Sequence, residues 1–135
     1  MTMKHLGPSV SNARMAEILE GAADQLDLCP WGQGIGRELE GQICAEDALW
    51  TSITGLGSWA EALLFLKQYG TAPDGSLTRS PQWWENFNVT NYVGARYLDG
   101  RSVWGWNDEA GRTKDEVVEL FRVAAKDLRN EAAPE

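Results

Sequence analysis

The segment from Thr113 to Leu128 reads TKDEVVELFRVAAKDL and is the clearest amphipathic helix in the chain. Thr113 and Glu116 match a capping box, in which a hydroxyl and a carboxylate satisfy free backbone N–H groups at a helix start. Apolar residues then recur at three- and four-residue spacing, which lines one helical face. They are Val117, Leu120, Phe121, Ala124, Ala125 and Leu128. The pattern predicts a closing helix that buries one face against other helices.

Three earlier segments carry helical patterns of the same kind. The first is expected to begin near Ser11 or Asn12, both good N-caps, and to end before Pro30. The second is expected from Ala45 to the break at Gly55. A third starts at the capping box of Ser58 and Glu61, carries Tyr69 on its inward face and stops at Gly70.

A fourth helix is expected to follow Ser80-Pro81, an N-cap with proline at the first helical position, and to end at Asp99-Gly100. Its predicted inward stripe consists of Trp84, Phe87, Asn91, Ala95 and Leu98.

With the closing helix, these segments predict an all-α, single-domain bundle of about five helices. We place the domain at residues 11–131, with flexible tails at 1–10 and 132–135. Strand-forming residues occur around Ile35 to Leu39 and around Ser102 to Trp106, and these two segments could pair as a small two-stranded β ribbon.

The composition excludes several classes of protein. The chain has 135 residues, which suits one domain with a real core. The formal net charge is −8, from 12 Lys and Arg against 20 Asp and Glu, and this balance argues against binding a nucleic-acid backbone. No apolar stretch reaches the length of a membrane span, and residues 1–10 lack the apolar core of a signal peptide. We therefore expect a cytoplasmic protein with its two cysteines reduced and with no membrane partner.

The residues required by common catalytic and cofactor sites are missing. The single histidine, His5, lies in the expected tail, which removes the usual Ser–His, Cys–His and zinc arrangements. The glycines from Gly32 to Gly36 fit no dinucleotide or phosphate-loop pattern. We expect no metal and no cofactor, and we consider an enzyme less favoured than a binding protein, although the sequence leaves catalysis open.

The negative charge is concentrated in one segment. Between Glu17 and Asp47 there are eight acidic residues and a single basic one, Arg37. A one-signed face would favour a basic protein partner, while ordinary solubilisation and mimicry of a nucleic acid remain alternatives. Within the segment, Glu38, Glu40, Glu46 and Asp47 could supply a pair of carboxylates for acid–base chemistry only if two of them are buried; a solvated face is the preferred interpretation.

Two tryptophan-containing segments are the main candidates for a functional site. The first contains Trp31 and Gln33, and the second runs from Trp104 through Trp106, Asn107 and Asp108 to Arg112. An Asx-turn at Asn107 or Asp108, a left-handed Gly111 and the Thr113 cap explain most of the second segment as structure. Arg112 is unfavourable for the dipole of a helix start, so we expect it to pair with Asp108, Asp47 or a ligand anion.

Two interpretations of these residues stay open. In the structural one, the tryptophans are core and Asn107, Asp108 and Arg112 fix the last turn. In the functional one, Trp31, Trp104 and Trp106 line a groove beside Arg37 and Arg112, because exposed Trp and Arg are favoured interface anchors. The candidate binding residues are Trp31, Gln33, Arg37, Trp104, Trp106, Asn107, Asp108 and Arg112.

Three motifs together resemble an uncharacterised family of small proteins from actinobacteria and their phages. They are Trp31-x-Gln33-Gly34, Cys44-Ala45 at a helix start, and Trp106-Asn107-Asp108-x-x-Gly111-Arg112-Thr113 before the last helix. The resemblance spans roughly Ala16 to Ala125, and this chain is shorter between Gly34 and Cys44 and more acidic after Cys44. It implies a phage or mobile-element accessory role and no particular chemistry.

The leading hypothesis is a non-enzymatic protein-binding module that acts on a host protein through the aromatic loop, the acidic face or both. One alternative is a small-molecule binder or small enzyme that uses Asn107, Asp108, Arg112 and Cys44 in a pocket. The other is an acidic nucleic-acid mimic. A homo-oligomer is compatible with all three.

Overall fold

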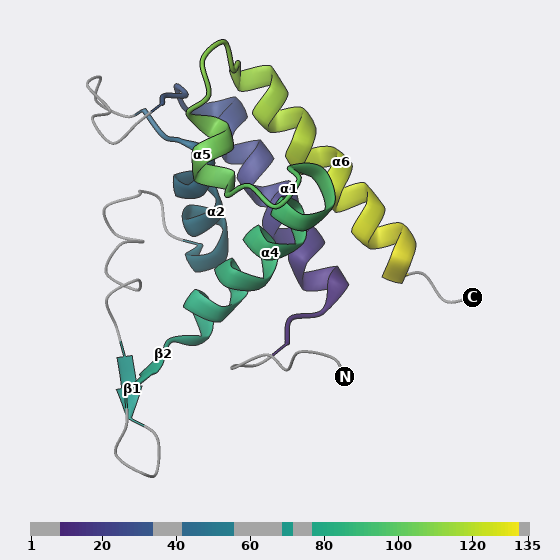
Figure 1. Ribbon diagram of the computed structural model, residues 1–135. Coiled ribbons are helices and arrows are strands. Elements are labelled where there is room, and N and C mark those ends of the chain that lie inside the picture. Colours follow the sequence, from purple (N-terminus) through teal and green to yellow (C-terminus); the bar gives the residue numbers. More distant parts are fainter. Residues whose placement is uncertain (1–8, 34–41, 56–68, 72–76, 133–135) are drawn as a thin grey trace.

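The computed structural model describes residues 9–33, 42–55, 69–71 and 77–132 as a bundle of five helices with one short hairpin (Figure 1). The helices are α1 (Asn12–Leu28), α2 (Ala45–Thr54), α4 (Pro81–Tyr97), α5 (Val103–Asn107) and α6 (Lys114–Ala132). The strands are β1 (Tyr69–Thr71) and β2 (Leu77–Arg79). The predicted all-α, single-domain bundle is therefore confirmed.

The helix starts follow from local side-chain chemistry. The Ser11 hydroxyl accepts the N–H of Arg14 at 3.1 Å and begins α1. Ser80 does the same for α4, with proline at its first position. At α6, the predicted capping box forms in both directions: Thr113 donates its N–H to Glu116 at 2.9 Å and its hydroxyl accepts the N–H of Glu116 at 3.2 Å. The predicted starts of these helices are confirmed.

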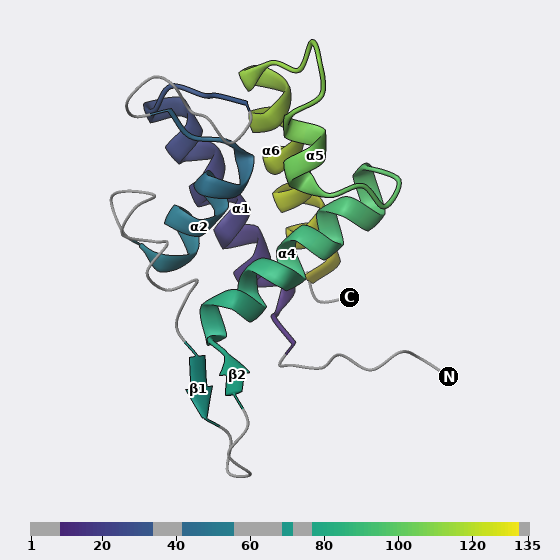
Figure 2. The same ribbon diagram turned by 60° about the vertical axis from the view of Figure 1, so that its left-hand side comes forward.

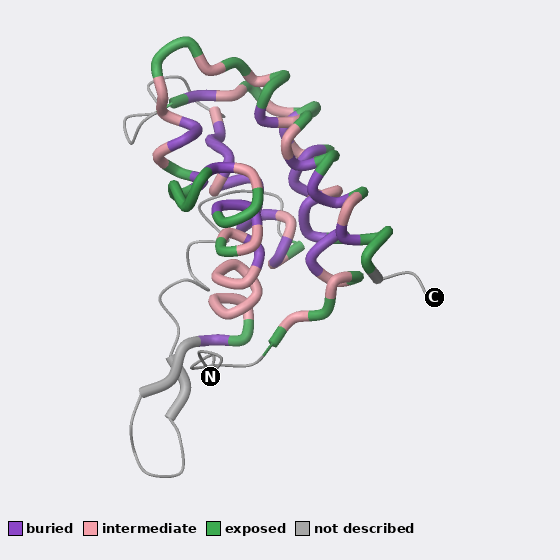
Figure 3. Tube along the Cα trace, turned by 45° about the vertical axis from the view of Figure 1, so that its right-hand side comes forward, coloured by how far each residue is buried: buried purple, intermediate pink, exposed green. Residues whose placement is uncertain are grey.

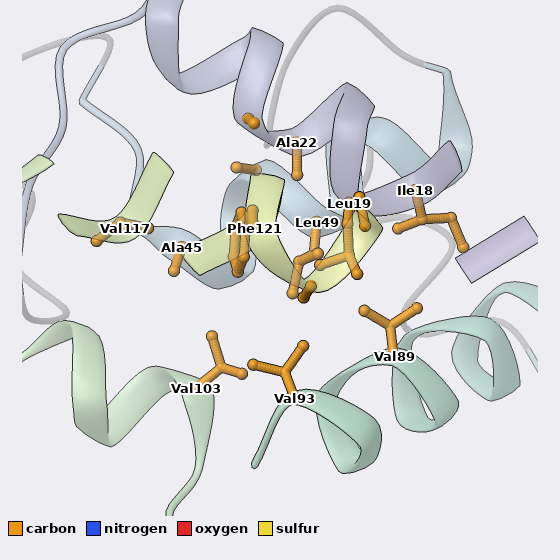
Figure 4. Close-up of a cluster of buried hydrophobic side chains, with 14 of the residues drawn as sticks. Ile18, Leu19, Ala22, Ala45, Leu49, Val89, Val93, Val103, Val117 and Phe121 are labelled. Atoms are coloured by element: carbon orange, nitrogen blue, oxygen red, sulfur yellow. The ribbon is translucent and has the colours of Figure 1, made fainter. Parts of the chain in front are cut away.

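The centre of the molecule is the antiparallel pair of α1 and α6, with α2 packed against α1. Small residues on the facing surfaces let the helices approach closely; they are Ala22, Ala23, Ala124 and Ala125, all buried. Larger side chains fill the space toward α2 and α4, as Figure 4 shows for Phe121, Leu19 and Leu49. The buried faces of the helices point inward throughout the bundle (Figure 3).

Helix α4 buries a different face from the predicted one. Its buried residues are Val89, Val93 and Gly94, whereas Asn91 and Ala95 of the predicted stripe are exposed. Trp84 and Phe87 are only partly buried, because they pack with Trp83 in an aromatic cluster at the start of the helix. The face of α4 that meets the core is therefore the one with the small residues Val89, Val93 and Gly94, and not the one with the large aromatic side chains.

The predicted β ribbon is wrong at Ser102 to Trp106, where the chain forms α5. The Ser102 hydroxyl accepts the N–H of Gly105 at 2.9 Å and caps this helix, which outweighs the strand preference of Val103 and the tryptophans. The other half of the ribbon, Ile35 to Leu39, lies outside the described residues.

The observed hairpin lies elsewhere in the chain. β1 and β2 pair antiparallel, with Tyr69 opposite Arg79, and β2 leads directly into α4 (Figure 2). The end of the predicted third helix is therefore wrong, because Tyr69 lies in a strand; its expected start at Ser58 lies outside the described residues.

The connection from α4 to α5 is tight because two backbones meet there. A Cβ added at Gly94 would lie 2.7 Å from the carbonyl oxygen of Arg101, so only glycine fits at this point of α4. Asp99 and Gly100 then adopt positive φ angles of 53° and 84°. This turn places the start of α5 beside α4 and directs the end of α5 toward α2.

Candidate functional site

Asn107, the last residue of α5, connects three segments of the chain through its buried side chain. Its oxygen accepts the indole N–H of Trp31 at 2.7 Å and the backbone N–H of Ala45, at the start of α2, at 3.1 Å. Its amide nitrogen donates to the Gly32 carbonyl at 3.3 Å and to the Asp108 carboxylate at 3.0 Å. Asn107 has no solvent exposure. We call these contacts, with those of Gln33 below, the Asn107 network.

Gln33 strengthens the same connection from the surface. Its side-chain amide donates to the backbone carbonyls of Asn107 at 2.9 Å and Glu109 at 2.8 Å. The segment that carries it is held by a parallel bridge between Trp31 and Ile43, in which Gly32 donates its N–H to the Ile43 carbonyl and Ile43 donates its N–H to the Pro30 carbonyl. Residues 31–33 are thus fixed to the loop that follows α5.

Arg112 covers the face of Trp106. Its guanidinium carbon lies 3.9 Å from the ring centroid, and its Nε donates to the Trp106 carbonyl at 3.1 Å. The remaining nitrogens pair with Glu109 at 2.7 Å and Glu116 at 3.2 Å. The predicted partners Asp108 and Asp47 are wrong, because Arg112 pairs with Glu109 across the turn before α6 and with Glu116 in the first turn of α6.

The predicted site residues therefore fall into two groups. The structure brings together Trp31, Gln33, Trp106, Asn107, Asp108 and Arg112 at the junction of α5, α2 and the loop before α6. Trp104 lies apart from this junction with 43% of its surface exposed, whereas Trp106 is 8% exposed. Arg37 lies outside the described residues. Gly111 has the predicted left-handed conformation, with φ of 83°.

A shallow apolar groove, wide open to solvent and not predicted from the sequence, runs along α6. It is lined by Trp106, Asp115, Glu116, Glu119, Leu120 and Val123 and has a volume of about 530 Å³. Val123 is 38% exposed, which is unusual for a large apolar residue of this chain. Glu116 is paired with Arg112, but Asp115 and Glu119 have no ion-pair partner among the residues that the structure describes. The signal in the sequence was Val123, an apolar residue outside the inward stripe.

The acidic residues of α1 are neutralised within the molecule. Arg129 of α6 forms two hydrogen bonds of 2.7 Å with Glu20, and this pairing lowers the pKa of the Glu20 carboxyl. Arg122 pairs with Asp24 at 3.3 Å and Asp27 at 2.5 Å. Glu17 pairs with Arg14 on its own helix. The high negative charge of the sequence segment therefore does not produce an unpaired acidic face on α1.

Two carboxylates at the start of α2 are withdrawn from solvent. Asp47 is buried and accepts the N–H of Cys44 at 3.1 Å, which caps the helix. Glu46 is half-buried, and loss of solvation, followed by repulsion from Asp47, raises the pKa of its carboxyl. The predicted solvated face is wrong for this pair, whereas Glu38 and Glu40 lie outside the described residues.

No group of three or more potential metal ligands occurs within the described parts of the chain. No helix in those same parts is long and apolar enough to span a membrane.

The comparisons with known proteins identify the family. A family model matches residues 10–127, from the residue before the Ser11 cap into the last turns of α6. The chain belongs to this family, DUF6197, a family of unknown function. No curated protein and no solved structure matches the chain. The DUF6197 match includes every segment that meets at Asn107, and it confirms the expected membership of an uncharacterised family.

Proposed function

We propose that this DUF6197 protein is a non-enzymatic binding module that holds a basic, amphipathic segment of a partner protein in the α6 groove. The observation that carries the proposal is the exposed apolar side chain of Val123, beside the half-buried Leu120, together with two carboxylates that have no ion-pair partner in the described chain. Exposed apolar surface is costly in water, and a complementary partner would cover it.

Charge selects the class of partner. Asp115 and Glu119 flank the apolar floor, so a segment with Lys or Arg beside its apolar side chains would match both properties of the groove. On α1, Glu20, Asp24 and Asp27 are already paired with arginines of α6. The α6 groove therefore offers a basic partner more unpaired negative charge than the surface of α1 does. A nucleic-acid mimic would need many unpaired carboxylates, so the ion pairs of α1 argue against this alternative.

The pocket version of small-molecule binding is also less favoured. The polar side chains of this region donate to protein groups: Gln33, Asn107 and Arg112 each bond a backbone carbonyl, and Arg112 also bonds the Glu109 carboxylate. Such bonds serve to connect segments of the fold. We propose that the Asn107 network supports the α6 groove, because Trp106, which lines the groove, directly precedes Asn107 in α5.

The resemblance to proteins of actinobacteria and their phages suggests where the protein acts. We propose an accessory role in the cytoplasm of an actinobacterium, or in a phage that infects one, with a basic host protein as the partner. The exposed Trp104 offers a second anchor on α5 for the same partner.

The first test uses a defined probe, an amphipathic helical peptide of leucine and lysine. Amide NMR shifts of the protein are followed during the titration, with a leucine–glutamate peptide as the charge control. We expect shifts centred on α6. The Glu119→Lys and Val123→Ser variants should each bind the leucine–lysine peptide roughly tenfold more weakly than wild type does. Leu28→Ser is the matched control, because Leu28 is 82% exposed and does not line the groove.

Equal affinity of wild type, Glu119→Lys and Val123→Ser for the peptide would refute the groove. Capture from a host lysate with the same variants then identifies the partner, and Trp104→Ala in that experiment shows whether α5 contributes. Partner capture that depends on Trp104 and not on Val123 would move the proposed interface from α6 to α5.

A further inference from the structure

A second hollow lies on another side of the bundle, where α2, α4 and the start of α5 meet. It has a volume of about 300 Å³ and is lined by Glu46, Phe87, Thr90, Asn91, Gly94, Ala95, Gly100, Arg101, Ser102 and Val103. No residue of the Asn107 network or of the α6 groove lines it. Its size is at the lower end of the range for small-molecule sites.

Glu46 is the unusual group in this pocket. It makes no hydrogen bond and no ion pair with any residue that the structure describes, although it is half-buried. Burying an ionised carboxylate without a partner is unfavourable, and the raised pKa of Glu46 reflects that cost. The N-terminal position of Glu46 in α2 offsets only part of it.

The other charged residue of the pocket does not neutralise Glu46. Arg101 donates from Nε to the Leu98 carbonyl at 2.9 Å, and its terminal nitrogen pairs with Glu109. Asp47, next to Glu46 in the sequence, adds negative charge rather than removing it. A cation that enters the pocket would therefore meet a carboxylate that the protein leaves uncompensated.

The remaining lining determines what kind of cation fits. Asn91 offers an amide oxygen, and Ser102 offers a hydroxyl oxygen that already accepts one N–H from Gly105. An ammonium group has three N–H donors, which these oxygens and the Glu46 carboxylate can accept. Phe87 and Val103 provide apolar surface for a short alkyl chain.

We propose that this pocket binds a small primary ammonium compound, with the Glu46 carboxylate as its counter-ion. The site does not depend on the proposed α6 groove, and either proposal can fail without the other. A carboxylate kept without an internal partner destabilises the fold, and binding of a cation would relieve that cost.

The test titrates the isotope-labelled full chain with n-butylammonium chloride and follows the backbone amide NMR signals. We expect saturable shifts at residues 45–47 and 100–103. Glu46→Gln, which keeps the shape of the side chain, should weaken binding at least about tenfold, because it removes the charge of the counter-ion. Asn91→Ala, at an exposed position of α4, should weaken binding by a smaller factor of about three.

Two controls separate this site from general surface electrostatics. Glu119→Gln removes one unpaired carboxylate from the α6 groove and should leave unchanged the shifts, and the affinity they report, at residues 45–47 and 100–103. 1-Butanol has a similar alkyl chain without the charge and should not produce the saturable shifts. The proposal is overturned if Glu46→Gln retains wild-type affinity with a folded spectrum, if Glu119→Gln equally weakens the binding that residues 45–47 and 100–103 report, or if butylammonium gives no saturable shift at those residues.

Discussion

The side-chain oxygen of Asn107 lies 2.7 Å from the indole nitrogen of Trp31 and accepts its N–H, which joins α5 to a segment 76 residues earlier. The same oxygen accepts the first N–H of α2 from Ala45. One buried amide thus satisfies the first N–H of α2, beside the capping box of Cys44 and Asp47, and anchors the loop after α1. The residues that resemble a functional motif in the sequence act here as a structural connection.

Asn107→Ala should lower the free energy of unfolding by about 3 kcal/mol, because it leaves the Trp31 indole and the Ala45 N–H buried without their acceptor. Urea denaturation followed by circular dichroism measures the change. Asn130→Ala, at an exposed position of α6, is the control and should change stability by less than about 0.5 kcal/mol. A loss at Asn107 as small as that of the control would contradict the assigned role.

Arg112→Lys should cost about 1 kcal/mol, although it keeps the positive charge. Lysine cannot reproduce the flat stacking on Trp106 or the simultaneous bonds to the Trp106 carbonyl and Glu109. Thermal unfolding at moderate salt measures the difference. Arg122→Lys is the control, because Arg122 forms surface ion pairs with Asp24 and Asp27 and does not stack on Trp106. If both substitutions shift the melting temperature equally, the Trp106 stacking has no special weight.

Local signals in the sequence were sufficient for the helices that begin with strong caps. Ser11, Ser80 and the box of Thr113 and Glu116 each satisfy N–H groups within four residues, so no distant partner is needed to predict them. α5 was mistaken for a strand because Val103 and its tryptophan neighbours favour strands, while the Ser102 cap lacks the acidic residue of a full box.

The candidate site was predictable only in part, because its decisive contacts are long-range. Trp31 and Asn107 are both candidate binding residues in the sequence, but no local pattern predicts the hydrogen bond between the Trp31 indole and the Asn107 amide. The partners of Arg112 could have been found, since Glu109 and Glu116 stand at helical ion-pair spacing. The carboxylates of Glu20, Asp24 and Asp27 appeared unpaired in the sequence because their arginines lie on α6, roughly a hundred residues away.

Glu20→Gln should make the protein less sensitive to acid. Because Arg129 lowers the pKa of folded Glu20, the pair stabilises the protein above the ordinary pKa of glutamate and loses this effect as the pH falls from about 5 to about 3. The pair is solvent-exposed, so the contribution at pH 7 should stay below about 1 kcal/mol. Unfolding midpoints across this pH range for wild type, Glu20→Gln and Glu119→Gln provide the measurement. Parallel curves for wild type and Glu20→Gln would contradict the prediction.

Unlike Glu20→Gln, which removes a stabilising ion pair, Glu46→Gln should raise the free energy of unfolding at neutral pH. The folded pKa of Glu46 is raised, so the folded state holds the proton more tightly than the unfolded state does. Stability linked to this group is therefore greatest below the ordinary pKa of glutamate and falls as the pH rises through the raised value. The charged groups nearby are Asp47, which adds to the shift, and Arg101, which is held by Glu109.

Urea midpoints at pH 4 and pH 7 test this sign. We expect Glu46→Gln to gain stability over wild type at pH 7 and to lose that advantage at pH 4, while Glu119→Gln follows wild type at both. Saturating butylammonium at pH 7 should then raise the midpoint of wild type and leave that of Glu46→Gln unchanged, because only the wild type has an uncompensated charge to neutralise. A Glu46→Gln variant less stable than wild type at pH 7 would show that the carboxylate has a stabilising partner, and the argument for a cation site would lose its physical basis.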